Sequence, residues 1–266
     1  MLPITSLDDP RIRAYRNLKD RELARDGGLF IAEGELILRR LMASDYPVES
    51  ALLSERRAEE IAPLIRPGIP IYVAPEDVLR RIIGYKFQSG ILAVGRRTPF
   101  PALEELNLLD RPRATLVICP ETSNAENMGS LIRIAAAFGV DAVLLGERCC
   151  DPFWRQSIRV SMGTIFSMPL IRSIDLLTDL RRLKENWGFE LIATVSNEQA
   201  EPLNDVPTPN RVGILFGNEA QGLDVQTLKV CNRQVRIPMR QGIDSLNVAV
   251  AAGIVLYHFA PVPRCG

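Results

Sequence analysis

The sequence predicts an α/β protein of two domains, the second built on a parallel β-sheet. The chain has 266 residues, more than most single compact domains, and 47% of them are hydrophobic, enough for a core in each half. Short β-rich runs alternate with helical patterns, which is typical of parallel sheets covered by helices. Three prolines fall within residues 99–113, which we interpret as a linker between domains at 1–98 and 114–266.

The elements of the first domain follow from short apolar runs and from apolar residues spaced three and four apart. The expected strands are residues 29–32, 69–73 and 91–94, and the expected helices are 35–43, 58–65 and 75–83. This alternation predicts a small α/β domain.

The second domain alternates more clearly. The expected strands are residues 114–119, 142–145, 189–195 and 212–216, and the expected helices are 127–138, 175–185 and 245–259. The last helix is apolar all round, which predicts that it is buried. In such sheets ligands bind beyond the carboxyl ends of the strands. The loops at 120–129, 217–222 and 238–245 occupy that position and are rich in Gly, Asn, Glu and Ser.

Composition excludes several classes of protein. The chain opens with polar and charged residues and holds no apolar run of 18, so neither a signal peptide nor a membrane span is expected. Five cysteines without a CxxC pair argue against a disulfide framework or a zinc site. We therefore expect a cytoplasmic protein with buried free thiols and no metal.

Charge gives a mixed indication about nucleic acid. The formal net charge is zero, which counts mildly against RNA binding. Residues 1–98 nevertheless carry two more basic than acidic side chains, and they begin with a basic cluster. Its members are Arg11, Arg13, Arg16, Lys19, Arg21 and Arg25. Contact with phosphates and a solvated helix face both remain open for this cluster.

Arg133 stands in the segment NMGSLIR at 127–133. Its neighbours three and four residues away on a helix are all small: Gly129, Ser130, Ala136 and Ala137. Such a face allows a substrate or another backbone to approach closely. An ordinary exposed arginine on a surface helix also fits this position.

The segment FGNEAQGL at 216–223 follows a predicted strand directly. Its glycines permit sharp turns and close approach to a ligand, and Asn218 and Glu219 add a polar pair. A plain strand-to-helix turn fits as well, and the GxGxxG dinucleotide fingerprint is absent.

The segment IPMRQGIDSLN at 237–247 leads into the closing helix, where Ser245 is the expected N-cap. Asn247 should then face the same loops. His258, the only histidine, stands at the far end of this helix. A histidine general base at the loops is therefore not expected.

These three segments, in this order and spacing, resemble the SpoU/TrmH family of RNA ribose methyltransferases in the SPOUT superfamily. The resemblance covers about residues 114–259. The matching residues are Asn127, Gly129, Arg133, Gly217, Glu219, Gly222, Leu223, Ile237, Pro238, Met239, Ser245, Leu246 and Asn247. Residues 1–98, through LFIAEGE at 29–35, resemble more loosely the ribosomal-protein-like substrate-binding domain that often precedes this catalytic domain.

The resemblance implies that residues 114–266 form a knotted (trefoil) parallel-sheet domain that binds S-adenosylmethionine and methylates a ribose 2′-hydroxyl. The implied partners are RNA, ribosomal more than transfer, and a second copy of the chain, with no DNA or membrane. The implied catalytic residues are Arg133, Asn127, Glu219, Ser245 and Asn247. The implied cofactor contacts are Gly217, Ile237, Leu246, Phe216 and Met239.

Arg133 would polarise or deprotonate the hydroxyl, and these two roles stay open. Two alternatives to the enzyme are also kept. One is a non-catalytic RNA-binding protein that retains the fold, and the other is a nucleotide-dependent enzyme of another α/β class. The missing GxGxxG and P-loop signatures count against the second.

Overall fold

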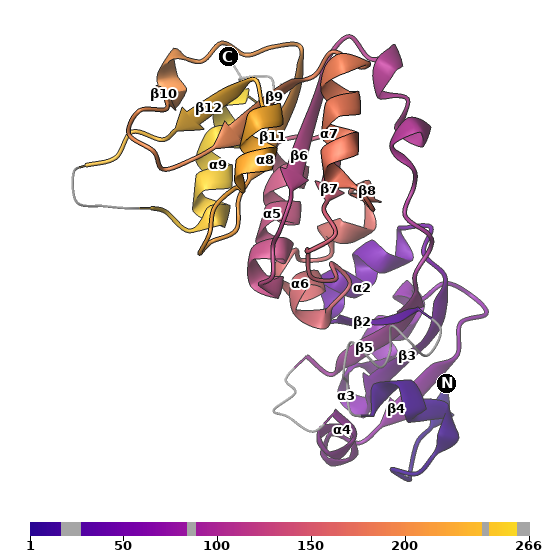
Figure 1. Ribbon diagram of the computed structural model, residues 1–266. Helices are drawn as coiled ribbons and strands as arrows, with labels where there is room; N and C mark the ends of the chain where they lie inside the picture. Colours follow the sequence, from indigo (N-terminus) through magenta and orange to yellow (C-terminus); the bar gives the residue numbers. More distant parts are fainter. Residues whose placement is uncertain (17–27, 84–88, 241–244, 260–266) are drawn as a thin grey trace, which may run out of the picture. The chain divides into compact units, whose positions relative to one another are not determined.

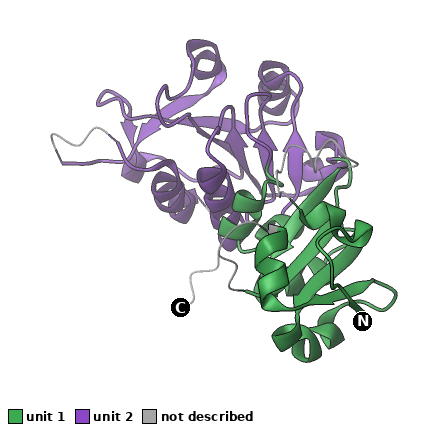
Figure 2. Ribbon diagram, turned by 90° about the horizontal axis from the view of Figure 1, so that it is seen from below, with its two compact units in different colours: residues 1–99, 152–167 green, residues 100–151, 168–266 purple. Residues whose placement is uncertain are grey.

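A computed structural model describes residues 1–16, 28–83, 89–240 and 245–259. The chain folds into two compact units (Figure 2). Unit 1 consists of residues 1–99 and 152–167, and unit 2 of residues 100–151 and 168–266. Lys19, Arg21 and Arg25 of the basic cluster lie outside the described residues, as does Cys265.

Unit 1 contains a mixed five-stranded sheet in the order β1-β4-β3-β5-β2. The strands are β1 (Leu2–Pro3), β2 (Leu29–Glu33), β3 (Val48–Ser54), β4 (Ile71–Ala74) and β5 (Ile91–Arg96). The helices are η1 (Pro10–Tyr15), α2 (Glu35–Met42), α3 (Glu55–Ile61), η2 (Ala62–Leu64), α4 (Glu76–Ile83), α6 (Arg155–Val160) and η5 (Thr164–Phe166). The central strand, β3, is one that the sequence patterns did not predict. It pairs with β4 in parallel and with β5 antiparallel.

The segment 152–167 corrects the expected domain boundary. We expected the whole of 114–266 to form one domain, but this segment groups with unit 1. The ring of Phe30 on β2 lies 5.2 Å from that of Phe153 and 5.4 Å from that of Phe166, measured between centroids. Tyr46 completes the cluster, 5.6 Å from Phe153. Aromatic burial thus recruits a stretch of the second half into the core of unit 1.

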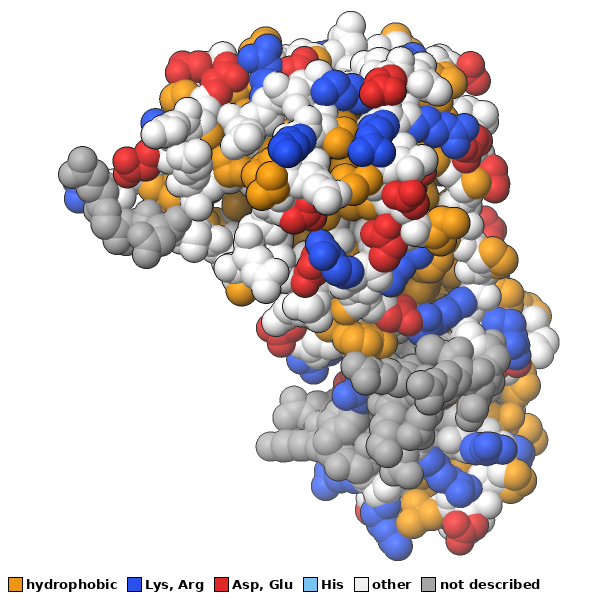
Figure 3. All heavy atoms as spheres, in the orientation of Figure 1, with side chains coloured by type: hydrophobic (Ala, Val, Ile, Leu, Met, Phe, Trp, Pro, Cys, Tyr) orange, Lys and Arg blue, Asp and Glu red, His pale blue; other side chains and the backbone are white. Residues whose placement is uncertain are grey.

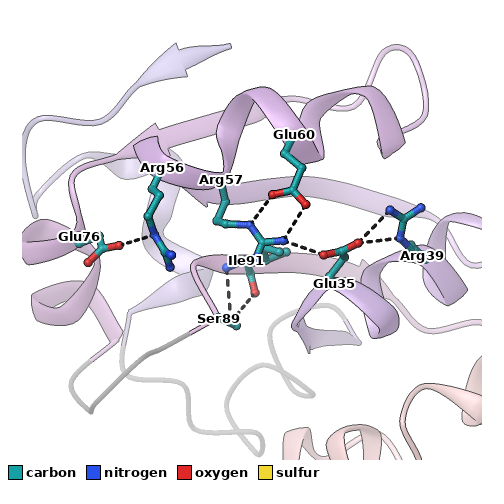
Figure 4. A network of polar contacts seen from close by, with 8 residues as sticks. All are labelled: Glu35, Arg39, Arg56, Arg57, Glu60, Glu76, Ser89 and Ile91. Carbon is teal, nitrogen blue, oxygen red and sulfur yellow. Dashed lines mark hydrogen bonds and ion pairs between the residues drawn. The ribbon is translucent and has the colours of Figure 1, made fainter.

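An ion-pair network joins α2 to α3 in unit 1 (Figure 4). Glu35, in the LFIAEGE segment, accepts hydrogen bonds from Arg39 at 2.9 Å and from Arg57 at 2.6 Å. These two guanidinium groups, Arg39 first, hold the pKa of Glu35 below its ordinary value. Arg57 also pairs with Glu60 at 3.0 Å. Both arginines are therefore paired with carboxylates within the chain.

Unit 2 contains a seven-stranded sheet in the order β10-β12-β9-β11-β6-β7-β8, in which every pair is parallel (Figure 1). The strands are β6 (Ala114–Cys119), β7 (Ala142–Leu145), β8 (Leu170–Arg172), β9 (Glu190–Thr194), β10 (Glu201–Pro202), β11 (Arg211–Phe216) and β12 (Arg233–Arg236). The helices are η3 (Leu103–Leu106), η4 (Leu108–Asp110), α5 (Ala125–Ala137), α7 (Leu176–Glu185), η6 (Leu203–Asp205), α8 (Val225–Val230) and α9 (Val248–Phe259).

The centre of this sheet is covered on both faces, as the apolar runs predicted. Every residue of β6 is buried, and so are five of the six residues of β11. Helix α5 packs against α9, and α7 packs against α8. Parallel strands end at the same edge of a sheet, so the loops that follow β6, β7 and β11 meet there.

The closing helix differs from the expectation in its start and in its burial. It begins at Val248, and Asn247 rather than Ser245 caps it, because the Asn247 side chain accepts the Ala249 N–H at 2.8 Å. One side of the helix is buried, while Val250, Ile254 and Tyr257 are exposed. No helix among the described residues is long and apolar enough to cross a membrane.

Candidate active site

Three polar side chains from the three motifs meet at the carboxyl edge of the unit 2 sheet. The Asn127 amide, on the first turn of α5, donates to the Glu219 carboxylate in the loop after β11. The Asn127 side-chain oxygen, Oδ1, accepts from the Asn247 side-chain amide at 3.1 Å. Asn127 therefore links Glu219 to Asn247 across 92 and 120 residues of sequence. Three segments that are far apart in the sequence thus form one hydrogen-bonded chain of side chains.

Local structure fixes the place of Asn127. Asn124 caps α5 by accepting the backbone N–H groups of Glu126 at 2.7 Å and of Asn127 at 3.1 Å. The cap starts the helix directly beyond β6, so Asn127 lies in the first turn at the edge of the sheet. The sequence segments named above do not include Asn124, and the structure gives it this capping role.

The loop after β11 is closed on itself. Asn218 and Gly222 exchange backbone hydrogen bonds of 3.0 and 2.8 Å, and Gly222 takes a φ of +67°. A Cβ added to Gly217 would lie 2.5 Å from the Gly222 carbonyl carbon. Glycine is thus required at 217 by the loop itself. A valine there would deform the loop whether or not a ligand is bound.

Arg133 and Ser245 stand apart from this hydrogen-bonded chain. The Arg133 side chain is exposed on α5 and has neither a hydrogen bond nor an ion pair with any residue that the structure describes. Ser245 is also exposed. Of the five expected catalytic residues, the structure connects three, and among the described residues the Arg133 guanidinium has no partner.

The expected cofactor residues lie at the ends of two strands. Phe216 ends β11 and is buried, whereas Ile237 and Met239 follow β12 and are half-buried. Leu246, just before α9, is 37% exposed. Strand β9 lies between β11 and β12, so the two strand ends are about 10 Å apart at about 4.8 Å per strand. Apolar side chains and loop backbone thus flank the end of β9.

The described part of this edge offers no histidine and no thiolate, but it carries the carboxylates of Glu121 and Glu219. The His258 ring bonds the Val206 carbonyl at 2.8 Å, about 16 Å along α9 from Asn247 at 1.5 Å per residue. Burial raises the pKa of the Cys119 thiol well above its usual value and that of Cys150 to about 12. The described residues contain no cluster of His, Cys, Asp and Glu that could hold a metal. Among the described residues of this edge, histidine and thiolate therefore supply no base.

Sequence reasoning missed a group of ion pairs among the loops that follow β6, β7 and β11. Arg148, after β7, contacts Glu121 at 2.9 Å and Asp224 at 3.4 Å. Glu121 also accepts from the Asn218 amide at 3.4 Å. No local sequence pattern marks these residues, because only the folding of the sheet brings their distant segments together.

Basic side chains form no continuous field on the face shown in Figure 3, where they intermingle with acidic ones. Part of the N-terminal basic cluster is paired within the chain. Arg11 pairs with Asp9 at 2.5 Å, and Arg16 donates to the Asp9 carbonyl at 2.6 Å. Arg13 is exposed and has no partner among the described residues. Of the three described members, Arg13 is the one available to a phosphate.

Comparisons with known proteins agree with this geometry. Residues 114–257 match the SpoU rRNA Methylase family. An uncharacterized tRNA/rRNA methyltransferase of Mycobacterium bovis is 38% identical over 94% of this chain and 88% of its own length. The 23S rRNA (guanosine-2′-O-)-methyltransferase RlmB of Acinetobacter baylyi is 30% identical over 77% of this chain and 84% of its own. A crystal structure of an RNA 2′-O ribose methyltransferase superimposes with a TM-score of 0.80 and 28% identity, covering 97% of each chain.

Proposed function

Because the chain belongs to the SpoU rRNA methylase family, we propose that it transfers the methyl group of S-adenosylmethionine to a ribose 2′-hydroxyl of structured RNA, ribosomal rather than transfer RNA. The observation that carries the proposal is the Glu219–Asn127–Asn247 chain at the carboxyl edge of a parallel sheet. It joins all three segments by which the sequence resembles the family. RNA as the substrate is consistent with the cytoplasm as its location.

The chemistry of the residues present suits the methyl donor. The donor's adenine ring and the methylene groups beside its sulfonium suit apolar surfaces, and Phe216, Ile237, Met239 and Leu246 offer them around the end of β9. Backbone groups of the loop at 217–222 that its internal hydrogen bonds do not use would meet the donor's polar atoms. S-Adenosylmethionine supplies, when bound, an activated methyl group on a positively charged sulfur. Glu219 places a negative charge near that edge of the sheet.

Arg133 is the residue that acts on the ribose in this proposal. Its exposed guanidinium, without a described partner in the chain, would hold an RNA phosphate and polarise the 2′-hydroxyl for attack. An arginine is a poor base in water, so its contribution is mainly electrostatic, and the proton leaves to water or to the phosphate. Asn127, Glu219, Asn247 and Ser245 orient the ribose; alignment of this kind can contribute several kcal/mol.

A homodimer and a trefoil knot complete the proposal. Three exposed apolar residues of α9, Val250, Ile254 and Tyr257, are spaced four and three residues apart and lie on one face. A second copy of the chain would cover this face in a symmetric pair. The C-terminal segment would close the knot beside the donor.

Residues 1–98 are proposed to contribute affinity for RNA. Among the described cations of unit 1, the side chains of Arg13, Arg81 and Arg159 have no hydrogen bond or ion pair with a described residue. The arginines of Figure 4 pair with carboxylates instead. Phosphate contacts of this domain should therefore depend on a few cations rather than on a broad basic surface.

A methyl-transfer assay tests the function. The purified chain is incubated with tritiated S-adenosylmethionine and ribosomal RNA from a strain that lacks the gene. We expect label to enter the RNA with the parent chain, and much less with Arg133→Ala. If the parent binds RNA and transfers no label, the non-catalytic RNA-binding alternative holds. If it binds NAD instead of S-adenosylmethionine in calorimetry, another α/β enzyme class holds.

A further inference from the structure

The loop at 217–222 is held at both of its ends by one arginine. Arg148 contacts Asp224, which caps α8 immediately after the loop, at 3.4 Å. It also contacts Glu121 at 2.9 Å, and Glu121 in turn accepts from Asn218 at the start of the loop. Glu121, Arg148 and Asp224 thus form an ionic clamp around the loop that carries Glu219.

The Arg148 end of the clamp is attached to the sheet. The Gly146 N–H donates to the Cys119 carbonyl at 2.9 Å, and the Cys150 N–H donates to the Thr122 carbonyl at 2.8 Å. The Cys149 thiol adds a contact of 3.0 Å to the Cys119 carbonyl. These bonds tie the loop after β7 to the loop after β6. Arg148 therefore projects from a fixed backbone.

The loop end of the clamp is also ordered locally. The Asn218 side-chain oxygen accepts the N–H groups of Ala220 at 2.9 Å and of Gln221 at 3.2 Å. Asp224 accepts the Thr227 N–H at 2.9 Å, which is the main reason that its pKa lies below the ordinary value. A displacement of Asn218 or Asp224 should therefore move the whole loop at 217–222.

From this geometry we infer that Arg148 and Glu121 are positioning residues that act through Asn218 and Asp224 to set the affinity for S-adenosylmethionine. This inference rests on the proposed function, in which the loop at 217–222 holds the methyl donor. Neither residue needs to touch the reacting atoms. Removing the clamp should change donor binding more than the chemical step.

The experiment compares Arg148→Met with a matched control, Arg111→Met. Methionine keeps an apolar stem and removes the charge. Arg111 is also about half exposed and ion-paired, to Asp141, but it stands before β6 at the opposite edge of the sheet. We expect Arg148→Met to raise the Kd and the KM for S-adenosylmethionine about threefold to tenfold, with kcat at saturating donor within twofold of the parent. The control should change neither quantity.

Further variants separate positioning from general loss of structure. Arg148→Lys, which keeps the charge, should recover part of the affinity. Glu121→Gln combined with Arg148→Met should cost less than the product of the single effects, because both disrupt one clamp. The parent should lose donor affinity between 0.05 and 0.5 M salt, and Arg148→Met should lose less, because salt screens exposed ion pairs.

Two results would overturn the inference. One is an unchanged Kd in Arg148→Met, with or without a lower kcat, and the other is an equal rise in Kd in Arg111→Met. Both leave the proposed function standing if the parent methylates RNA. A parent chain that binds no S-adenosylmethionine would instead remove the proposed function itself, so the two failures are distinguishable.

Discussion

Asn127 gives the sharpest test of the hydrogen-bonded chain, through the substitution Asn127→Asp. The parent side chain donates to Glu219 and accepts from Asn247. The substitution keeps the size and the acceptor but replaces the donor with a carboxylate oxygen. It therefore removes one hydrogen bond and places two negative charges face to face.

The expected cost follows from the contacts. A hydrogen bond to a charged group contributes about 1.5–3 kcal/mol. Two carboxylates about 4 Å apart repel by about 1 kcal/mol in water and by about 4 kcal/mol at an effective dielectric constant of 20. Glu219 is exposed, so the values near the lower ends apply. A total of about 2.5 kcal/mol corresponds to a loss of roughly 70-fold in kcat/KM.

The assay is steady-state transfer of tritiated methyl groups to RNA, with thermal unfolding measured on the same samples. Asn127→Ala, which removes the donor without adding charge, should lose less activity than Asn127→Asp. Asn232→Asp is the matched control, because Asn232 is exposed, accepts the Leu191 N–H through its side-chain oxygen and lies at the amino end of β9. Asn127→Asp with a kcat/KM within threefold of the parent would refute the role assigned to the Glu219–Asn127–Asn247 hydrogen-bonded chain.

Four other outcomes follow from the structure. Arg133→Ala should lower kcat at least 100-fold while the Kd for S-adenosylmethionine by calorimetry stays within threefold, and near-normal turnover would remove its role. Phe153→Ala should destabilise the protein by about 3–5 kcal/mol in urea unfolding, because it empties the aromatic core of unit 1; a cost below 1 kcal/mol would contradict that packing. Tyr257→Asp should shift the protein from dimer to monomer in light scattering, and a parent that is a fully active monomer would refute the dimer. Arg13→Ala should weaken RNA binding and flatten its salt dependence, whereas an unchanged slope would leave Arg13 a solvated surface residue.

The sequence predicted most of unit 2 because its strands are short apolar runs separated by clear turn residues. β6 and β7 match their expected bounds, and α5 and α7 differ by one or two residues. The central strand of unit 1, β3, escaped because Val48–Ser54 contains Glu, Ala and Leu, which favour helices as much as strands. Strand β12 escaped because RQVR has one apolar residue in only four positions.

The sequence predicted the residues of the candidate site that lie in its motifs. It did not predict those that depend on contacts between distant segments. Glu219, Asn127 and Asn247 were expected together because their loops follow or adjoin parallel strands. The N-cap was misassigned because Ser245 and Asn247 are both good capping residues and only the backbone decides between them. The Arg148 clamp and the place of residues 152–167 depend on contacts between distant segments, which one sequence does not display.

The position of the methyl group on the RNA tests the central claim most directly. Unmodified ribosomal RNA is incubated with the chain and S-adenosylmethionine, digested to nucleosides and fragments, and mapped by mass spectrometry. The account predicts a 2′-O-methylated nucleotide at a defined position with the parent chain and its loss with Arg133→Ala. A methyl group on a base, or no methyl group in RNA from a chain that binds S-adenosylmethionine, would contradict the account.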